Sequence, residues 1–192
     1  MKVDGQGKLP RERSQRIRDL GTPDSSGRTV LPPGFQFRPA TNGDGPAVRA
    51  LVFATLREYG LCPDPASTDA DLDGLEQHYR ATGGCFDVLL EPGGQVIGSF
   101  GLLRLTAETC ELRKMYLARN YRGRGLGRVL LDRALAAARV MNCRRITLQT
   151  ASVLREAIAL YEKTGFRPFA DPHMPARCNL ALELRLEKAS AK

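Results

Sequence analysis

The sequence has no long hydrophobic run and very little histidine. No apolar stretch approaches the roughly 20 residues that a helix needs to cross a bilayer, and Met1 to Pro10 lack the apolar core of a secretory signal. We therefore expect a cytoplasmic protein with no membrane partner. His78 and His173 are the only histidines, and neither lies in a nucleophile or metal motif. Catalysis should therefore depend on other groups.

Cysteine is scarce and dispersed. The five cysteines are Cys62, Cys85, Cys110, Cys143 and Cys178. Their number is odd and no two have CxxC spacing, so we expect neither disulfides nor a zinc site, and we predict no bound metal. A cysteine nucleophile is disfavoured as well, because no histidine or other base accompanies any of them.

The length of 192 residues, 42% of them hydrophobic, suits one core better than two. We predict a flexible basic tail over residues 1–34 and one domain over 35–188. The tail is rich in arginine, glycine and serine and poor in aliphatic residues, so burial cannot offset the entropy lost on ordering it. Contact of this tail with RNA or a membrane surface is the alternative that we keep.

The net charge of +8 is distributed unevenly. Residues 38–110 hold five Arg and Lys against ten Asp and Glu, whereas residues 111–145 hold ten against two. The basic part coincides with a glycine-rich stretch, which indicates a compact polyanionic ligand more than an extended duplex. We thus do not expect nucleic acid as a partner, and binding through the tail and the basic part stays a minor alternative.

Apolar periodicity predicts alternating strands and helices. We expect strands over residues 35–38, 86–90, 95–105, 110–117, 145–150, 166–169 and 179–186. We expect helices over residues 48–59, 69–80 and 154–164, with another that follows the glycine-rich stretch and ends near Met141. Gly98 and Gly101 inside a strand indicate a bulge or a close approach of backbone.

The glycine-rich stretch lies between a strand and a helix, which is an arrangement that holds a pyrophosphate. Glycines let the backbone approach the anion, and free amides at the helix start point toward it. The Lys-Ser/Thr ending of a P-loop and the acidic residue of a dinucleotide-binding unit are both missing. Arg124 and Arg128 are candidates for charge-assisted contacts to the phosphates, the alternative being solvated side chains.

Three motifs together carry a family resemblance. Arg122-Gly123-Arg124-Gly125-Leu126-Gly127 resembles the Q/R-x-x-G-x-G/A signature of GNAT N-acetyltransferases. The stretches 111–117 and 157–166 resemble the fourth strand and the A-x-x-L-Y-x-x-x-G-F segment of the same family, in the right order. The resemblance covers roughly residues 35–186.

The resemblance implies an α/β (α+β) fold, with a splayed mixed sheet of six to seven strands flanked by about four helices. It implies an N-acetyltransferase whose cosubstrate, acetyl-CoA, enters between the fourth and fifth strands. The residues that it implies for cofactor binding are Met115, Tyr116 and Leu117 on the fourth strand, then Arg122, Gly123, Arg124, Gly125, Leu126, Gly127 and Arg128 in the loop.

Transfer to an amine requires a proton acceptor and benefits from a proton donor. A lysine-like ammonium of pKa about 10.4 is free at pH 7 in only about one molecule in 2,500. By the resemblance, Glu111 is the candidate base, with a strand-end ion pair or a water chain as the alternative. Tyr161 matches the tyrosine that often protonates the departing thiolate, with an ordinary core tyrosine as the alternative.

Two departures from the family pattern bear on the site. Many relatives have asparagine where this chain has Leu154, and glutamate where it has Gln149. They motivate a second hypothesis, that of a CoA-binding sensor or scaffold without turnover.

The acceptor amine is the least determined part of the sequence analysis. The acidic balance of residues 38–110 motivates the hypothesis of a cationic acceptor, such as a polyamine, an aminoglycoside or a protein amine. The acidic residues concerned are Asp64, Asp69, Asp71, Asp73 and Glu76. A homodimer is possible on the sequence alone.

Overall fold

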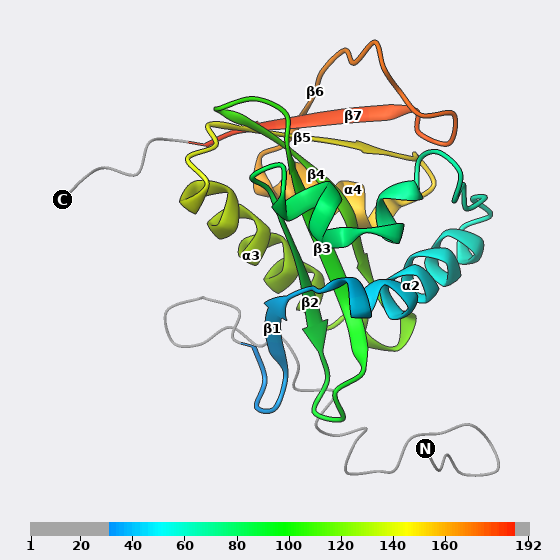
Figure 1. The fold of residues 1–192 in the computed structure, drawn as a ribbon. Coiled ribbons are helices and arrows are strands. Elements are labelled where there is room, and N and C mark those ends of the chain that lie inside the picture. The colour runs from blue at the N-terminus through cyan, green and yellow to red at the C-terminus, as the bar shows by residue number, and fades with distance from the viewer. Residues whose placement is uncertain (1–30, 187–192) are drawn as a thin grey trace.

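The structure is a computed structural model, and it describes residues 31–186 (Figure 1). The strands are β1 (Gln36–Pro39), β2 (Cys85–Leu90), β3 (Val96–Arg104), β4 (Thr109–Leu117), β5 (Arg145–Thr150), β6 (Arg167–Pro168) and β7 (Leu180–Arg185). The helices are α2 (Gly45–Glu58), α3 (Leu126–Val140) and α4 (Arg155–Thr164), with short helical turns η1 (Asn42–Asp44), η2 (Ala70–Asp73), η3 (Glu76–Arg80) and η4 (Arg119–Tyr121). Almost all of the predicted tail lies outside the described residues, and so do the last two residues of the predicted domain.

The seven strands form one mixed sheet in the order β1-β2-β3-β4-β5-β7-β6. Neighbouring strands run antiparallel except for β4 and β5, which are parallel. These two pair only through Thr109–Glu111 and Arg145–Thr147, at one end, and then diverge. The fold prediction of a splayed mixed sheet is confirmed, and the gap that it creates is where the site lies.

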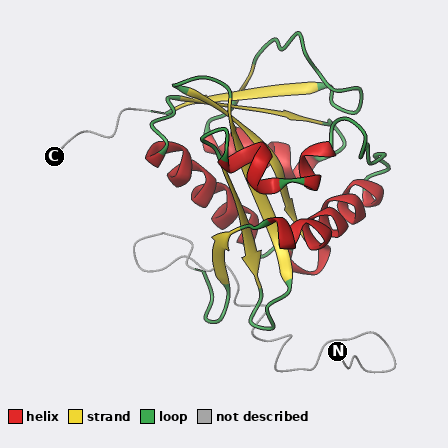
Figure 2. Ribbon diagram, viewed as in Figure 1, coloured by secondary structure: helices red, strands yellow, loops and turns green. Residues whose placement is uncertain are grey.

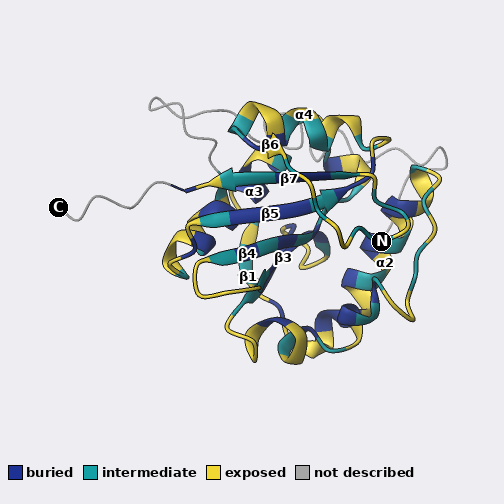
Figure 3. Cartoon of the chain, turned by 90° about the horizontal axis from the view of Figure 1, so that it is seen from above, coloured by how far each residue is buried: buried dark blue, intermediate teal, exposed yellow. Residues whose placement is uncertain are grey.

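Helices cover both faces of the sheet (Figures 2 and 3). On one face, the amphipathic helix α3 packs Leu130, Leu131 and Ala134 into a hydrophobic cluster. This cluster also holds Phe166, which follows α4. On the other face, α2 packs Val48 and its neighbours with η2 and η3. In the described part of the chain, no helix is both long and apolar enough to cross a membrane.

A β-bulge deforms β4 opposite β3. The register shifts between Ser99 and Gly101, so that Lys114 and Met115 bulge, and Lys114 adopts a φ of 50°. The Ser99 hydroxyl donates to the Lys114 carbonyl oxygen at 2.8 Å, which fixes this conformation. A Cβ on Gly101 would lie 2.5 Å from the Tyr79 ring, so the glycine permits a close approach there. The bulge turns the next residues of β4 toward the gap.

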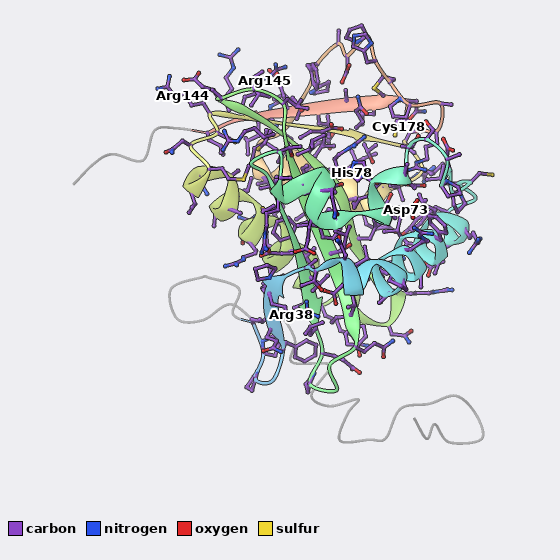
Figure 4. The ribbon with its side chains drawn as sticks, viewed as in Figure 1. Arg38, Asp73, His78, Arg144, Arg145 and Cys178 are labelled. Atoms are coloured by element: carbon purple, nitrogen blue, oxygen red, sulfur yellow. The ribbon has the colours of Figure 1, made fainter. Side chains whose placement is uncertain are left out.

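The predicted helix over residues 69–80 is wrong. Instead the chain forms the short 3₁₀ turn η2 and the π turn η3, separated at Gly74, whose φ of −154° and ψ of 74° are not helical. Figure 4 labels Asp73 and His78 on this broken segment in front of the sheet. The reason is tertiary: Asp69 and Asp71 are buried and pair with Lys114 and Arg113 of β4, which a continuous helix would not allow.

Candidate active site

A cleft of about 580 Å³ opens where β4 and β5 diverge. Its walls are β4, β5, the glycine-rich loop with the start of α3, helix α4, and the loop that precedes β7. All but two of the residues predicted for the site line it. The residues that line it are Glu111, Met115, Tyr116, Leu117, Arg122, Gly123, Gly125, Gly127, Arg128 and Tyr161. Arg124 and Leu126 do not line it, and Leu126 is a buried core residue instead.

The glycine-rich loop has the geometry of an anion site. Gly123 and Gly125 have φ of 72° and 77°, values that L side chains rarely adopt, and Gly125 is the N-cap of α3. None of the backbone amides of residues 123–127 donates a hydrogen bond to another described residue. A Cβ on Gly123 would meet nothing within 4 Å, so the space beside it is open. These free donors sit at a helix N-terminus, where negative charge is favoured.

The three arginines of the loop differ in what they contact. Arg122 is turned toward α2: its Nη1 donates to Glu58 at 2.7 Å and its Nε to the Leu117 carbonyl at 2.7 Å. Arg128 pairs with Asp132 one turn along α3 at 2.8 Å. Arg124 has a buried Nη1 with no partner among the described residues. The Arg122 guanidinium thus fixes the end of β4 against α2.

The β4 residues after Glu111 have no pairing partner on β5. Met115, Tyr116 and Leu117 line the cleft on this unpaired side, while Tyr116 and Leu117 pair with β3 on the other. Backbone N–H and C=O groups on an unpaired strand edge are free to bond a ligand. The cleft therefore presents both free amides at the helix and a free strand edge.

Glu111 lies at the last β4–β5 pair and faces the cleft. Its side chain is 14% exposed. Burial raises the pKa of this carboxyl, Arg113 opposes the rise, and Asp171 adds to it. Arg113 Nε lies 3.4 Å from Glu111 Oε1. A glutamate with a raised pKa that faces a cleft suits a general base.

Tyr161 projects from α4 into the same cleft. Its ring is buried against Phe166 at a centroid distance of 5.5 Å. Burial raises the pKa of the phenol, and Tyr116 adds to the rise, so the hydroxyl stays protonated at neutral pH. The hydroxyl has no hydrogen-bond partner among residues 31–186, which leaves it available to a bound molecule.

The two departures from the family pattern also lie at the cleft. Gln149 donates from Nε2 to Asp171 at 2.8 Å and to the His173 carbonyl at 3.2 Å. It thereby ties β5 to the loop that precedes β7. Leu154 is the residue before α4 and makes no side-chain cap.

Sequence reasoning missed a buried ion cluster beside the cleft. Asp69 accepts from Lys114 at 2.6 Å and from both terminal nitrogens of Arg177 at 2.6 Å. Burial opposes ionisation of Asp69, but hydrogen bonds from Arg177, the Asp64 amide and Lys114 lower its pKa to about 2. Asp69 lies 45 and 108 residues from these partners along the chain, so no local motif signals the cluster.

The other acidic side chains that motivated a cationic acceptor are engaged within the protein too. Asp71 accepts from the Tyr79 hydroxyl at 2.6 Å and lies 3.3 Å from Lys114. Asp73 pairs with Arg49, and Glu76 lies 3.6 Å from Arg80. Asp64 accepts from Thr68 in a tight turn. Most of these carboxylates are thus neutralised by ion pairs within the protein.

The thiols show no sign of nucleophilic activation. Burial raises the pKa of Cys85 to about 11 and raises the pKa of Cys178, which lines the cleft and is labelled in Figure 4. A thiol with a raised pKa is a poor nucleophile. Across residues 31–186, no three His, Cys, Asp or Glu side chains are grouped as a metal site.

Known proteins and one protein family match this chain in sequence. The profile of the Acetyltransferase (GNAT) family matches residues 52–166. The Escherichia coli (strain K12) protein named uncharacterized N-acetyltransferase YjgM is 39% identical over 142 residues, which are 71% of this chain and 84% of that protein. N-acetylaspartate synthetase of Danio rerio is 35% identical over 50% of this chain, but the match covers only 35% of that protein.

Solved structures resemble the fold. A GNAT-family acetyltransferase from Staphylococcus aureus Mu50 superimposes with a TM-score of 0.74 at 22% identity, over 80% of this chain and 99% of that one. Spermidine N-acetyltransferase from Vibrio cholerae, solved with CoA and spermine, gives a TM-score of 0.62 at 20% identity, over 81% and 97%. Both confirm the predicted architecture.

Proposed function

Since the chain belongs to the acetyltransferase (GNAT) family and is an N-acetyltransferase, we propose that it moves an acetyl group from acetyl-CoA directly to an amine in the cleft between β4 and β5. One observation carries this proposal: a single cleft holds the free amides of Gly123, Gly125 and Gly127, the unpaired edge of β4, and Glu111 with its raised pKa. An anion site and a base thus face the same space.

The residues of the cleft fit coenzyme A. Gly123, Gly125 and Gly127, with the amides at the start of α3, would hold the pyrophosphate. Met115, Tyr116 and Leu117 would bond the pantetheine through their free backbone groups. Acetyl-CoA supplies the acetyl group as a thioester. In the proposed pose Arg122 acts through its packing on α2, because its guanidinium is bonded to Glu58 and Leu117.

Two side chains would move protons. The Glu111 carboxylate would accept the proton that the amine loses as its nitrogen bonds to the acetyl carbon, and burial brings the pKa of Glu111 nearer neutrality for this role. The Tyr161 hydroxyl would donate a proton to the departing sulfur, and it is protonated at neutral pH because burial raises its pKa. No cysteine intervenes, so transfer takes place in one ternary complex.

Acceptors of both charges occur among the relatives and neighbours. By their names, one relative makes N-acetylaspartate and one structural neighbour acetylates spermidine, so acceptors of opposite charge occur among them. A cationic acceptor for this chain stays a prediction, but the pairing of Asp69, Asp71 and Asp73 removes most of its support. The cytoplasmic location, the homodimer and the boundary at Phe35 stay predictions as well.

One experiment distinguishes the proposed transferase from the alternative hypothesis of a CoA-binding sensor. Purified protein is given acetyl-CoA and a panel of amines, and released thiol is measured while both substrates are varied. The proposal expects turnover with intersecting double-reciprocal lines, as for a ternary complex. Tight acetyl-CoA binding by calorimetry without transfer to any amine would favour the sensor, and parallel lines would indicate an acyl-enzyme.

A further inference from the structure

One wall of the cleft carries three cationic side chains, namely Arg113, Lys114 and Arg177. Glu111, Arg113 and Lys114 come from β4, and Arg177 comes from the loop between β6 and β7. We call these four side chains the acceptor wall. Asp69 and Asp71 pair with its cations without lining the cleft.

Two cations of the acceptor wall are already bonded. Lys114 Nζ donates to Asp69 and to the Thr68 carbonyl, at 2.6 and 2.7 Å. Both terminal nitrogens of Arg177 bond the same Asp69 carboxylate. These side chains shape the wall, but most of their donors are used.

Arg113 is different from its neighbours. Its side chain is 25% exposed, and its nearest carboxylate oxygens are at 3.4 Å on Glu111 and 3.5 Å on Asp71. It donates no side-chain hydrogen bond to another residue of the described range 31–186. A guanidinium has five N–H donors in a planar fork, and largely buried polar groups are normally bonded. The fork of Arg113 is therefore free to bond an oxygen ligand in the cleft.

Charge counting gives the sign of that ligand. The acceptor wall and its two partners hold three cations, namely Arg113, Lys114 and Arg177, and three carboxylates, namely Asp69, Asp71 and Glu111. The group is neutral while Glu111 is ionised. When Glu111 takes a proton from the amine, one positive charge is left over in a largely buried place. A carboxylate on the acceptor would neutralise it at Arg113.

The spacing of the two groups gives the size of the acceptor. Arg113 Nε lies only 3.4 Å from Glu111 Oε1, on the same side of β4 because the residues are two apart. A molecule whose amine reaches Glu111 and whose carboxylate reaches Arg113 must carry the two groups close together. An α-amino acid has this spacing, whereas a polyamine offers only cations to the guanidinium.

On the basis of the proposed function, we propose that the acceptor is a compact aminocarboxylate, an α-amino acid in the simplest case, whose carboxylate is bound by Arg113. Arg113 then determines specificity, and the acceptor is a zwitterion and not a polycation. Lys114, Asp69 and Arg177 hold the wall in place.

The test compares acids with their own amides. Several L-amino acids, each beside its α-carboxamide, and spermine are offered with acetyl-CoA, and thiol release is measured. The binding of each acid and amide to the CoA-loaded protein is measured by calorimetry without turnover. We expect kcat/KM and affinity to favour the acid over its amide by at least tenfold, a factor typical of one charge-assisted contact.

Variants then assign the preference to one side chain. Arg113→Met should reduce the ratio of kcat/KM for the acid to kcat/KM for its amide to less than about threefold, and Arg113→Lys should retain part of the preference because it keeps the charge without the fork. The matched control is Arg133→Met, an arginine of α3 that pairs with Asp87 away from the cleft; it should keep the full preference.

The outcomes separate this inference from the proposed function. Turnover of amides or spermine as fast as that of acids, or a full acid preference in Arg113→Met, would overturn the aminocarboxylate acceptor while leaving the transferase. Absence of transfer to every amine would overturn the transferase, and the acceptor with it. Because the comparison of acid with amide is made first on the unaltered protein, it does not depend on how well a variant folds.

Discussion

The two walls of the cleft are built in different ways. The cofactor wall, residues 122–128 with the unpaired edge of β4, offers backbone groups from one continuous stretch and its neighbouring strand. The acceptor wall offers side chains, and they are held by Asp69 through contacts across 45 and 108 residues of sequence. A backbone site tolerates many side chains around it, whereas a side-chain site depends on each charge. The two walls should therefore respond differently to substitution.

The largest effect is expected where a charge is removed behind the acceptor wall. Asp69→Ala leaves Lys114 and Arg177 without their shared anion, so we expect the free energy of unfolding to fall by about 3–5 kcal/mol in urea titrations. The control Asp73→Ala removes a carboxylate that is 60% exposed and should cost about 0.5 kcal/mol or less. Equal losses in both variants would contradict the role assigned to Asp69.

The same carboxylate should govern stability in acid. Because the folded pKa of Asp69 is about 2 and the unfolded value is about 3.9, its stabilisation is complete above pH 4 and is lost as pH falls toward 2. We expect this loss to lower the free energy of unfolding by about 2 kcal/mol in acid. Urea titrations between pH 5 and 2 should show that Asp69→Asn lacks this component.

Next in size is the base. Glu111→Gln should lower kcat/KM at pH 7 about a hundredfold, since a general base contributes a factor of this order, while the Kd of acetyl-CoA is unchanged. The base works when deprotonated, so wild-type activity should fall as pH drops through the raised pKa of Glu111, and the variant should lack this acidic limb. Glu108→Gln, at a glutamate that is 58% exposed, is the control. A variant with full activity at pH 7 would exclude Glu111.

The effect of Tyr161→Phe should be smaller. The phenylalanine keeps the packing on Phe166 but lacks the proton, so we expect kcat to fall about tenfold with stability and acetyl-CoA affinity retained. Single-turnover rates at pH 7 would measure it. If kcat is unchanged, Tyr161 is a core residue and another group protonates the sulfur.

The smallest effect is expected at the cofactor wall. Gly123→Ala disfavours the positive φ of this loop by about 1 kcal/mol, so the Kd of acetyl-CoA should rise about fivefold in calorimetry, with the acceptor KM unchanged. Gly94→Ala is a matched control, because Gly94 has a φ of 78° with open space around it in the turn after β2. A similar loss of affinity in both variants would mean that the loop acts only through stability.

The contrast between the walls also explains what the sequence could predict. The strand before the glycine-rich loop, the helix α3 after it and the α4 segment follow from local periodicity and motif, so they were predicted with nearly correct bounds. The segment 69–80 was wrongly predicted to be one helix, because contacts to Lys114, Arg113 and Arg177 override its helical periodicity. Arg122 fitted the motif, yet its guanidinium lies on α2, which only the packing of distant elements determines.

The short parallel pairing of β4 with β5 has a mechanical consequence. Three residue pairs join two otherwise separate halves of the sheet, one of four strands and one of three. The width of the mouth between the halves is therefore fixed at this junction, where Cys110 packs in the core against Cys143. Enlarging either thiol would overpack the core at this junction, so residues outside the cleft contribute to keeping the two halves in place.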